Sequence, residues 1–146
     1  MRLGFGSAYS QRSANCVSLI RKRLLFVDDE RGIRETLSVI LLRNGFTVTL
    51  AANVQQALKQ IEAQEFDLLL CDLNIEQKRD GYTVVRTMRE VNPRCITIIL
   101  TGYPDMETAI EGIHLGVVDY ITKPTNADEL VALLTEKLAA RQLAKS

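Results

Sequence analysis

The sequence lacks the features by which several common protein classes are recognised. It has no tryptophan, one histidine and three cysteines, and no cysteine falls in a Cys-x-x-Cys or Cys/His metal spacing. Neither GxGxxG nor GxxxxGK[ST] occurs, so the usual nucleotide-binding loops are missing. The one histidine, His114, is predicted late in a helix, where it is typical of a surface residue rather than of a Ser-His-Asp triad. No apolar run is long enough for a membrane span or a signal peptide.

Opposite charges are unevenly distributed along a chain whose formal net charge is zero. Residues 1–23 contain five basic residues and no acid, whereas the remainder contains 13 basic and 18 acidic residues. We predict that residues 1–23 form a disordered basic extension and that residues 24–146 form the folded domain. A targeting peptide and a false start of translation are alternatives for the extension. An acidic folded part argues against nucleic-acid binding.

Two of the cysteines, Cys71 and Cys95, lie inside apolar runs. Such positions are typical of buried thiols that remain reduced, because free cysteine packs as a small apolar side chain. We therefore expect a cytoplasmic protein.

From residue 24 onward, short apolar runs alternate with helical patterns. The expected strands are Leu24–Val27, Phe46–Leu50, Asp67–Cys71, Cys95–Leu100 and Val117–Ile121. The helix boundaries are predicted from Asn44-Gly45, the Asn53/Gln56 capping box, Pro93, Pro104-Asp105 and the Asn126/Glu129 pair. Fivefold alternation predicts an α/β fold, a doubly wound parallel sheet with helices on both faces.

Polar residues follow four of the predicted strands, directly or after one intervening residue. Asp28 and Asp29 follow the first strand, Asp72 the third, Thr101 the fourth and Lys123 the fifth. In a doubly wound sheet these ends share one edge, where ligands bind. Three carboxylates, a hydroxyl and an ammonium are therefore predicted to converge on one cleft. Because like charges repel, the crowding also predicts that Asp28→Asn stabilises the metal-free protein.

The strand ends, DD, D, T and KP in that order, resemble the receiver domain of two-component response regulators over about residues 24–140. The resemblance implies a flavodoxin-like (βα)5 fold with a five-stranded parallel sheet of order 2-1-3-4-5. It also implies the phospho-acceptor, Asp72, which would receive a phosphoryl group from a histidine kinase phosphohistidine. Lys123 would form an ion pair with Asp72 and later with the phosphate.

The same resemblance implies a Mg²⁺ site and a switch. The metal ligands would be Asp28, Asp29, Asp72 and the backbone carbonyl of Asn74. Thr101 would hydrogen-bond a phosphate oxygen, and Tyr120 would follow it inward and change the surface formed by the fourth helix and the fifth strand.

The sequence departs from the family pattern after the phospho-acceptor. Glu76 stands where the family usually has proline. Gly81 follows Asp72 by nine residues, one more than usual, so the stretch NIEQKRDG carries an insertion. The insertion adds no ligand side chain, and we expect it to change the loop and its partners rather than phosphorylation.

The predicted function is that of a stand-alone receiver, not an enzyme beyond its own phosphorylation and dephosphorylation. Its partners would be a sensor histidine kinase or histidine phosphotransfer protein and a downstream protein, with no nucleic acid and no membrane, as a monomer or a phosphorylation-dependent dimer. One alternative is a Mg²⁺-dependent phosphohydrolase of the aspartyl-phosphate type, which would place an acid two residues after Asp72, where Asn74 stands. A pseudo-receiver that only binds partners and a fragment of a larger regulator are further alternatives.

Overall fold

The computed structural model describes residues 22–123 and 126–145. The predicted extension lies almost wholly outside these ranges and stays a prediction. Only Lys22 and Arg23 of that segment are described, and they pair with Phe46 and Thr47 as the start of the first strand. Within the described ranges, no helix is both long enough and apolar enough to cross a membrane.

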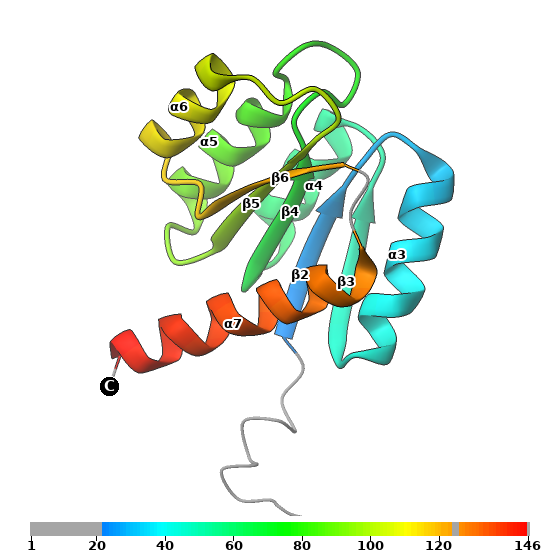
Figure 1. Cartoon of the computed structure of the whole chain (residues 1–146), viewed down its shortest axis with the longest axis vertical. Coiled ribbons are helices and arrows are strands. Elements are labelled where there is room, and N and C mark those ends of the chain that lie inside the picture. The colour runs from blue at the N-terminus through cyan, green and yellow to red at the C-terminus, as the bar shows by residue number, and fades with distance from the viewer. Residues whose placement is uncertain (1–21, 124–125, 146) are drawn as a thin grey trace, which may run out of the picture.

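A single parallel sheet of five strands forms the centre of the molecule, with the order β3-β2-β4-β5-β6 (Figure 1). The strands are β2 (Lys22–Val27), β3 (Phe46–Ala51), β4 (Leu68–Asp72), β5 (Ile96–Thr101) and β6 (Asp119–Thr122). In chain order this is the predicted 2-1-3-4-5 arrangement, which confirms the fold class. The observed strand boundaries differ from the predicted ones by one or two residues.

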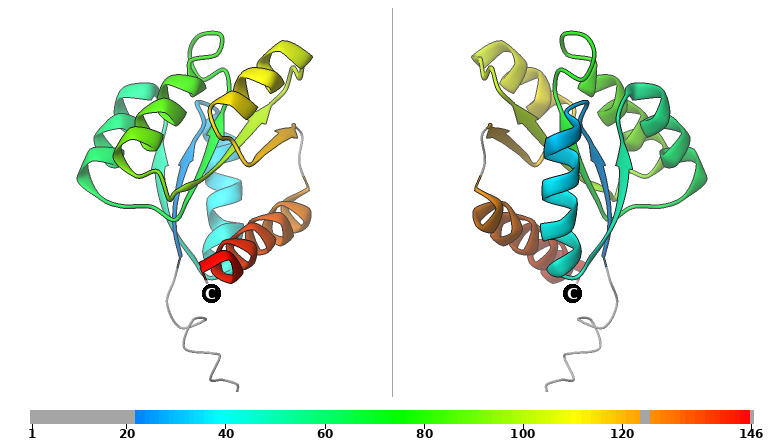
Figure 2. Two further views of the ribbon diagram at one scale, coloured as in Figure 1. Left: turned by 90° about the vertical axis from the view of Figure 1, so that its left-hand side faces the viewer. Right: turned by 90° about the vertical axis from the view of Figure 1, so that its right-hand side faces the viewer.

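Helices cover both faces of the sheet (Figure 2). They are α3 (Arg31–Arg43), α4 (Val54–Ala63), α5 (Gly81–Val91), α6 (Met106–His114) and α7 (Ala127–Lys145). Two buried clusters separate the layers, one shared with α4 and α5 and the other with α3 and α7. Because β2 is covered on both sides, Leu25 and Val27 belong to the first cluster and Leu24 and Phe26 to the second.

Local signals in the sequence explain several helix ends. The Asn53 side chain accepts a hydrogen bond from the backbone N–H of Gln56, as predicted for the start of α4. The Gln56 side-chain oxygen accepts a hydrogen bond from the backbone N–H of Ala52, whereas in a capping box it would accept from the N–H one residue later, that of Asn53. Gly45 has a φ of +93°, which a residue without Cβ adopts easily, and it ends α3.

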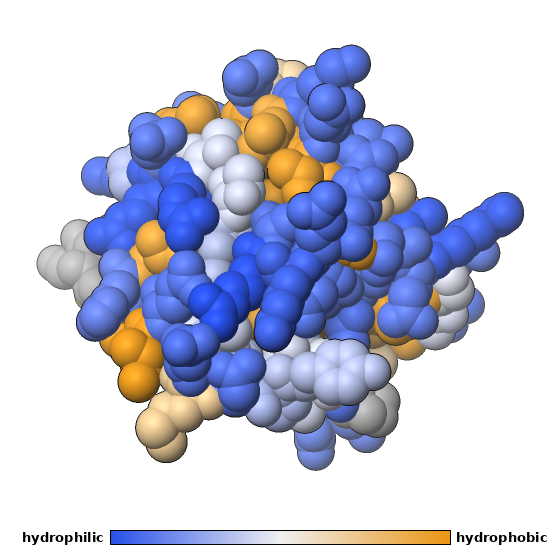
Figure 3. All heavy atoms as spheres, turned by 90° about the horizontal axis from the view of Figure 1, so that it is seen from above, coloured by the Kyte–Doolittle hydropathy of each residue, from blue (hydrophilic) through white to orange (hydrophobic). Residues whose placement is uncertain are grey.

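Helix α6 differs from the other helices in the kind of residue that it buries. Its large apolar residues Met106, Ile110 and Ile113 are exposed, whereas Thr108 and Gly112 are its buried residues. The apolar pattern that identifies α6 in the sequence therefore lies on its outer face. Seen from the end of the molecule toward which the strands run, several separate apolar patches interrupt a largely hydrophilic surface (Figure 3).

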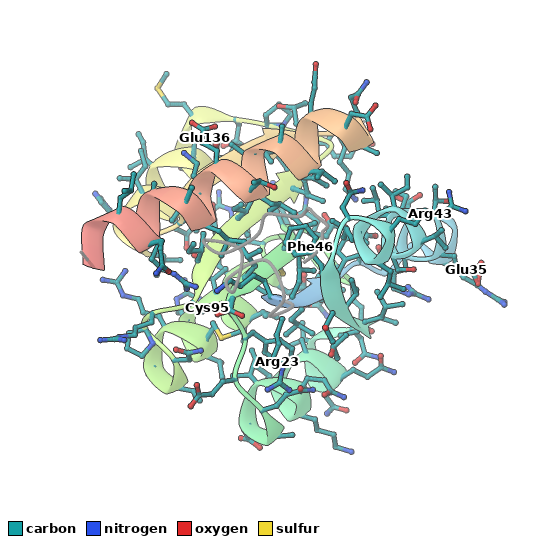
Figure 4. The ribbon with its side chains drawn as sticks, turned by 90° about the horizontal axis from the view of Figure 1, so that it is seen from below. Arg23, Glu35, Arg43, Phe46, Cys95 and Glu136 are labelled. Carbon is teal, nitrogen blue, oxygen red and sulfur yellow. The ribbon has the colours of Figure 1, made fainter. Side chains whose placement is uncertain are left out.

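The opposite end of the sheet is held together by polar contacts of Asp67. Its carboxylate accepts a hydrogen bond from the N–H of Arg23 at 2.9 Å and pairs with the Arg141 guanidinium of α7 at 3.2 Å. Figure 4 shows this end, with Arg23, Phe46 and Cys95 labelled around the start of the sheet. Cys71 and Cys95 are both buried, as predicted, and burial raises the pKa of each thiol, that of Cys95 to about 12.

Candidate functional site

The register of the sheet brings the predicted acids together. Val27 of β2 pairs with Cys71 of β4, so the residues that follow, Asp28 and Asp72, lie side by side at the carboxyl end of the sheet. Asp28 is fully buried, Asp72 is 6% exposed, and Asp29 is exposed. One carboxylate oxygen from each of the three lies within 4.8 Å of the others. We refer to Asp28, Asp29 and Asp72 as the acid cluster.

Lys123, after β6, supplies a positive charge to the acid cluster. Its Nζ lies 2.8 Å from Asp28 Oδ2 and 3.3 Å from Asp72 Oδ2. The sequence predicted the contact with Asp72 and did not predict the shorter one with Asp28. The lysine backbone N–H donates to the Thr101 carbonyl at 2.7 Å, which holds the end of β6 against β5.

The electrostatics of the site raise two pKa values. Burial, with the nearby Asp28 charge, raises the pKa of Asp72 from 3.8 to about 6, although Lys123 and the Asn74 N–H act in the opposite direction. Burial by itself lowers the pKa of Lys123, but the hydrogen bond and charge of Asp28 and the charge of Asp72 outweigh it, so its pKa is raised. At pH 7 Asp72 is therefore mainly ionised and Lys123 is protonated.

Asn74 connects the acid cluster to the loop that contains the insertion. Its backbone N–H approaches Asp72 Oδ1 at 3.3 Å, and its side-chain oxygen accepts a hydrogen bond from the N–H of Arg79 at 2.7 Å. Since the side-chain oxygen is engaged within the loop, the backbone carbonyl is the Asn74 oxygen that remains for a metal. Gly81 closes the loop, and a Cβ there would lie 2.2 Å from the Asp72 carbonyl oxygen, so only glycine fits.

The two predicted switch residues lie in different surroundings. Thr101 is fully buried at the end of β5, and its hydroxyl accepts a hydrogen bond from the N–H of Tyr103 at 3.1 Å. Tyr120 is half-buried, and its hydroxyl lies 2.5 Å from the Thr108 hydroxyl in the first turn of α6. Tyr82, from α5, donates to the Thr108 carbonyl. Thr108 and Tyr82 could not be identified from the sequence, because their roles depend on contacts of α6 with α5 and β6 that no local pattern shows.

A pocket of about 990 Å³ opens beside the acid cluster. Asp29, Asp72 and Lys123 form its polar end, and Tyr103 lies at its edge and is 82% exposed. The apolar wall comes mainly from α3 and β5, with Ile33, Leu37, Ile40, Leu100 and Ala127. Asp72 is thus reachable from solvent although little of its surface is exposed.

The donor set of the acid cluster fits Mg²⁺. Carboxylate and carbonyl oxygens are the ligands that a small hard cation prefers, and opposite ligands of octahedral Mg²⁺ lie about 4 Å apart. Oxygen atoms within 4.8 Å of one another can reach one ion after small side-chain rotations. No thiol or imidazole is part of this group, so the chemistry of the donors does not favour zinc.

The fold and the site together define a class of protein: a doubly wound α/β domain with a metal-competent acidic site at the carboxyl end of its sheet. The model of the response regulator receiver domain family matches residues 24–135, and the chain belongs to this family. Phosphorylation and Mg²⁺ binding are typical of the family, whose members interact with histidine kinases.

Curated relatives and solved structures agree with this assignment. The chain is 37% identical over 116 residues to the transcriptional regulatory protein ZraR of Escherichia coli, covering 80% of this chain and 26% of ZraR. It is 38% identical over 120 residues to the transcriptional regulatory protein DltR of Streptococcus agalactiae, covering 82% of this chain and 52% of DltR. The chain thus spans about a quarter to a half of these relatives.

Two solved structures are similar over most of the chain. A CheY-like receiver domain protein from Methanospirillum hungatei has a TM-score of 0.81 and 30% identity, covering 86% of this chain and 99% of that protein. A response regulator from Burkholderia pseudomallei has a TM-score of 0.72 and 29% identity, covering 86% of this chain and 75% of that one, and it contains a phosphorylated aspartic acid and a calcium ion.

Proposed function

We propose that this domain is a phosphorylation switch in which Asp72 accepts a phosphoryl group from the phosphohistidine of a sensor kinase or phosphotransfer protein. The observation that supports this most directly is the position of Asp72, which is nearly buried, 3.3 Å from Lys123 and beside two further acids at the end of a pocket. A carboxylate in this position can act as a nucleophile, and Lys123 partly neutralises its negative charge.

The residues of the site have separate roles in the phosphoryl transfer. An oxygen of Asp72 forms a bond to phosphorus while the N–P bond of the phosphohistidine breaks, and the electron pair of that bond stays on the imidazole nitrogen. Lys123 neutralises charge on Asp72 and on the transferred phosphoryl group. Asp28, Asp29, Asp72 and the Asn74 carbonyl would hold Mg²⁺, which supplies charge neutralisation for the phosphoryl oxygens when bound.

The response to phosphorylation would spread from Thr101 toward α6. Thr101 is buried beside the site, and its hydroxyl would turn from the N–H of Tyr103 to a phosphate oxygen. The Tyr103 segment leads into α6, whose first turn is bonded to Tyr120 through Thr108. The exposed apolar residues of α6 would then present an altered surface to a downstream protein.

We propose that the domain acts through protein contacts in the cytoplasm, either alone or as part of a longer chain. ZraR and DltR are named as transcriptional regulators, and contact with DNA in such proteins need not involve this domain. The phosphohydrolase alternative is less well supported, because Asn74 occupies the position of the second acid and its side chain is engaged with Arg79.

Phosphotransfer from a panel of labelled histidine kinases and phosphotransfer proteins tests the proposal. Wild type and the surface control Asp128→Asn should become labelled in Mg²⁺ and not in chelator, whereas Asp72→Asn should not. The label should be stable in acid and lost in hydroxylamine, as expected for an acyl phosphate. Labelling of Asp72→Asn at the wild-type level would contradict the assignment, and multiple turnovers of a phosphomonoester would favour the phosphohydrolase.

A further inference from the structure

The loop that follows the phospho-acceptor turn, residues 74–80, is closed by its own hydrogen bonds. The Asp80 carboxylate accepts three backbone N–H groups at 2.7–3.0 Å, those of Ile75, Glu76 and Gln77. The Asn74 side chain accepts the N–H of Arg79, and the N–H of Gly81 donates to the Leu73 carbonyl. We call residues 74–80 the inserted loop. These bonds connect the whole of the inserted loop to Asn74.

Arg79 connects the inserted loop to α6. Its φ of +65° is unfavourable for a residue with a Cβ, and among the described residues it is the only non-glycine with a positive φ. Its guanidinium forms an ion pair with Glu107 in the first turn of α6, and its Nη1 lies 3.6 Å from Glu111 Oε1, one turn later. Two acids of one helix thus face one arginine of the loop.

The contact between Arg79 and Glu111 is an ion pair without a hydrogen bond. Glu111 Oε2 accepts a hydrogen bond from Arg86 of α5 at 3.0 Å. Glu111 Oε1 is buried and has no hydrogen-bond partner among the described residues, and its distance of 3.6 Å to Arg79 exceeds that of a hydrogen bond. A buried carboxylate oxygen without a donor is unfavourable. An approach of the loop and α6 by less than an ångström would provide the donor.

We propose that Arg79 is a positioning residue that couples the Asn74 turn to helix α6, so that a cation bound at the acid cluster alters α6 by a route independent of Thr101 and Tyr120. The inference rests on the proposed function only for the cation site. A cation that engages the Asn74 carbonyl would move the inserted loop, and Arg79 would pass that movement to Glu107 and Glu111. Coupling between two sites is reciprocal, so loss of Arg79 also weakens cation binding.

Titration with Mg²⁺ alone, without a phosphodonor, tests the coupling. The variants are Arg79→Met, which keeps the approximate length of the side chain and removes its charge, and Arg79→Lys, which keeps the charge but loses the planar guanidinium and its paired N–H donors. Arg86→Met is the matched control, because it removes another arginine from Glu111 and leaves the loop contact intact. The measurements are the Mg²⁺ dissociation constant and the amide shifts of α6 at saturation.

For Arg79→Met we expect a two- to fivefold weaker Mg²⁺ affinity and α6 shifts reduced by at least half, with partial recovery in Arg79→Lys. Arg86→Met should match wild type in both measurements. Glu107→Gln, which breaks the same link from the helix side, should reproduce the reduced α6 shifts.

Two outcomes would overturn the coupling. Equal α6 shifts in wild type and Arg79→Met at saturating Mg²⁺ would show that the loop does not act on α6. Equal reductions of the Mg²⁺ affinity and of the α6 shifts in Arg79→Met and Arg86→Met would show that the ion pairs only hold the helix in place. Both outcomes leave phosphorylation of Asp72 intact, whereas a wild-type protein that fails to bind Mg²⁺ contradicts the metal site of the proposed function as well.

Discussion

Replacing Asp72 by asparagine should stabilise the metal-free protein, and the gain should depend on pH. The carboxylate is 6% exposed, and burial together with the Asp28 charge raises its pKa to about 6. Asparagine keeps the shape of the side chain and removes the charge. The substitution therefore relieves the cost of holding an ionised group in this environment.

The size of the expected gain in stability follows from the pKa of Asp72. A rise from 3.8 to about 6 corresponds to about 3 kcal/mol of unfolding free energy at neutral pH, at roughly 1.4 kcal/mol for each unit. Lys123 loses one of its two close partners in the variant, which offsets part of the gain, so we expect about 1–3 kcal/mol. Because the folded-state pKa lies above the unfolded-state value, the penalty in wild type is full above about pH 6 and disappears as the pH falls toward 4.

Urea unfolding of both proteins in chelator, from pH 4 to pH 8, measures the effect. Asp72→Asn should be more stable at pH 7.5 and equal to wild type near pH 4, and excess Mg²⁺ should reduce the difference by stabilising wild type. Asp28→Asn should gain less, because its carboxylate makes the 2.8 Å contact with Lys123 and accepts the Glu30 N–H. An Asp72→Asn protein that is less stable than wild type at pH 7.5 would refute the reasoning. So would a difference in unfolding free energy between the two proteins that does not vary with pH.

Three further substitutions probe the switch and the loop. Thr101→Ala should accept phosphate but shift the amide resonances of α6 and β6 less than wild type does, and identical shifts would contradict the coupling. Tyr120→Phe removes the hydrogen bond to Thr108 and should cost about 0.5–1.5 kcal/mol, with faster amide exchange in α6; unchanged exchange would show that the bond does not hold the helix. Gly81→Ala would place a Cβ 2.2 Å from the Asp72 carbonyl oxygen and should destabilise by more than about 2 kcal/mol in denaturant unfolding. An alanine variant of wild-type stability would show that the turn relaxes.

The fold and the location of the site were predictable because they depend on short-range patterns. Apolar runs such as Leu24–Val27 are needed for strands covered on both sides, and residues that follow parallel strands must meet at one edge of the sheet. The register that sets Asp28 beside Asp72 is a consequence of the same arrangement. The acid cluster could therefore be predicted from sequence as a group.

Side-chain contacts away from the shared strand ends were not predictable in the same way. The pattern of α6 does not reveal that Ile110 and Ile113 face outward, because that depends on how Tyr82 and Tyr120 fill the space beneath the helix. Similarly, the insertion was visible in the sequence, but the contact between Arg79 and α6 depends on the conformation of the loop.

The most direct test of the central claim is to identify the residue that carries the phosphoryl group. The protein is phosphorylated with acetyl phosphate and Mg²⁺ and then reduced with borohydride, which converts an aspartyl phosphate to homoserine, and the modified peptide is sequenced by mass spectrometry. We predict homoserine at position 72 and at none of the other aspartates, with the acid cluster residues Asp28 and Asp29 unmodified. Homoserine at another position, or equal phosphate incorporation into Asp72→Asn, would contradict the account.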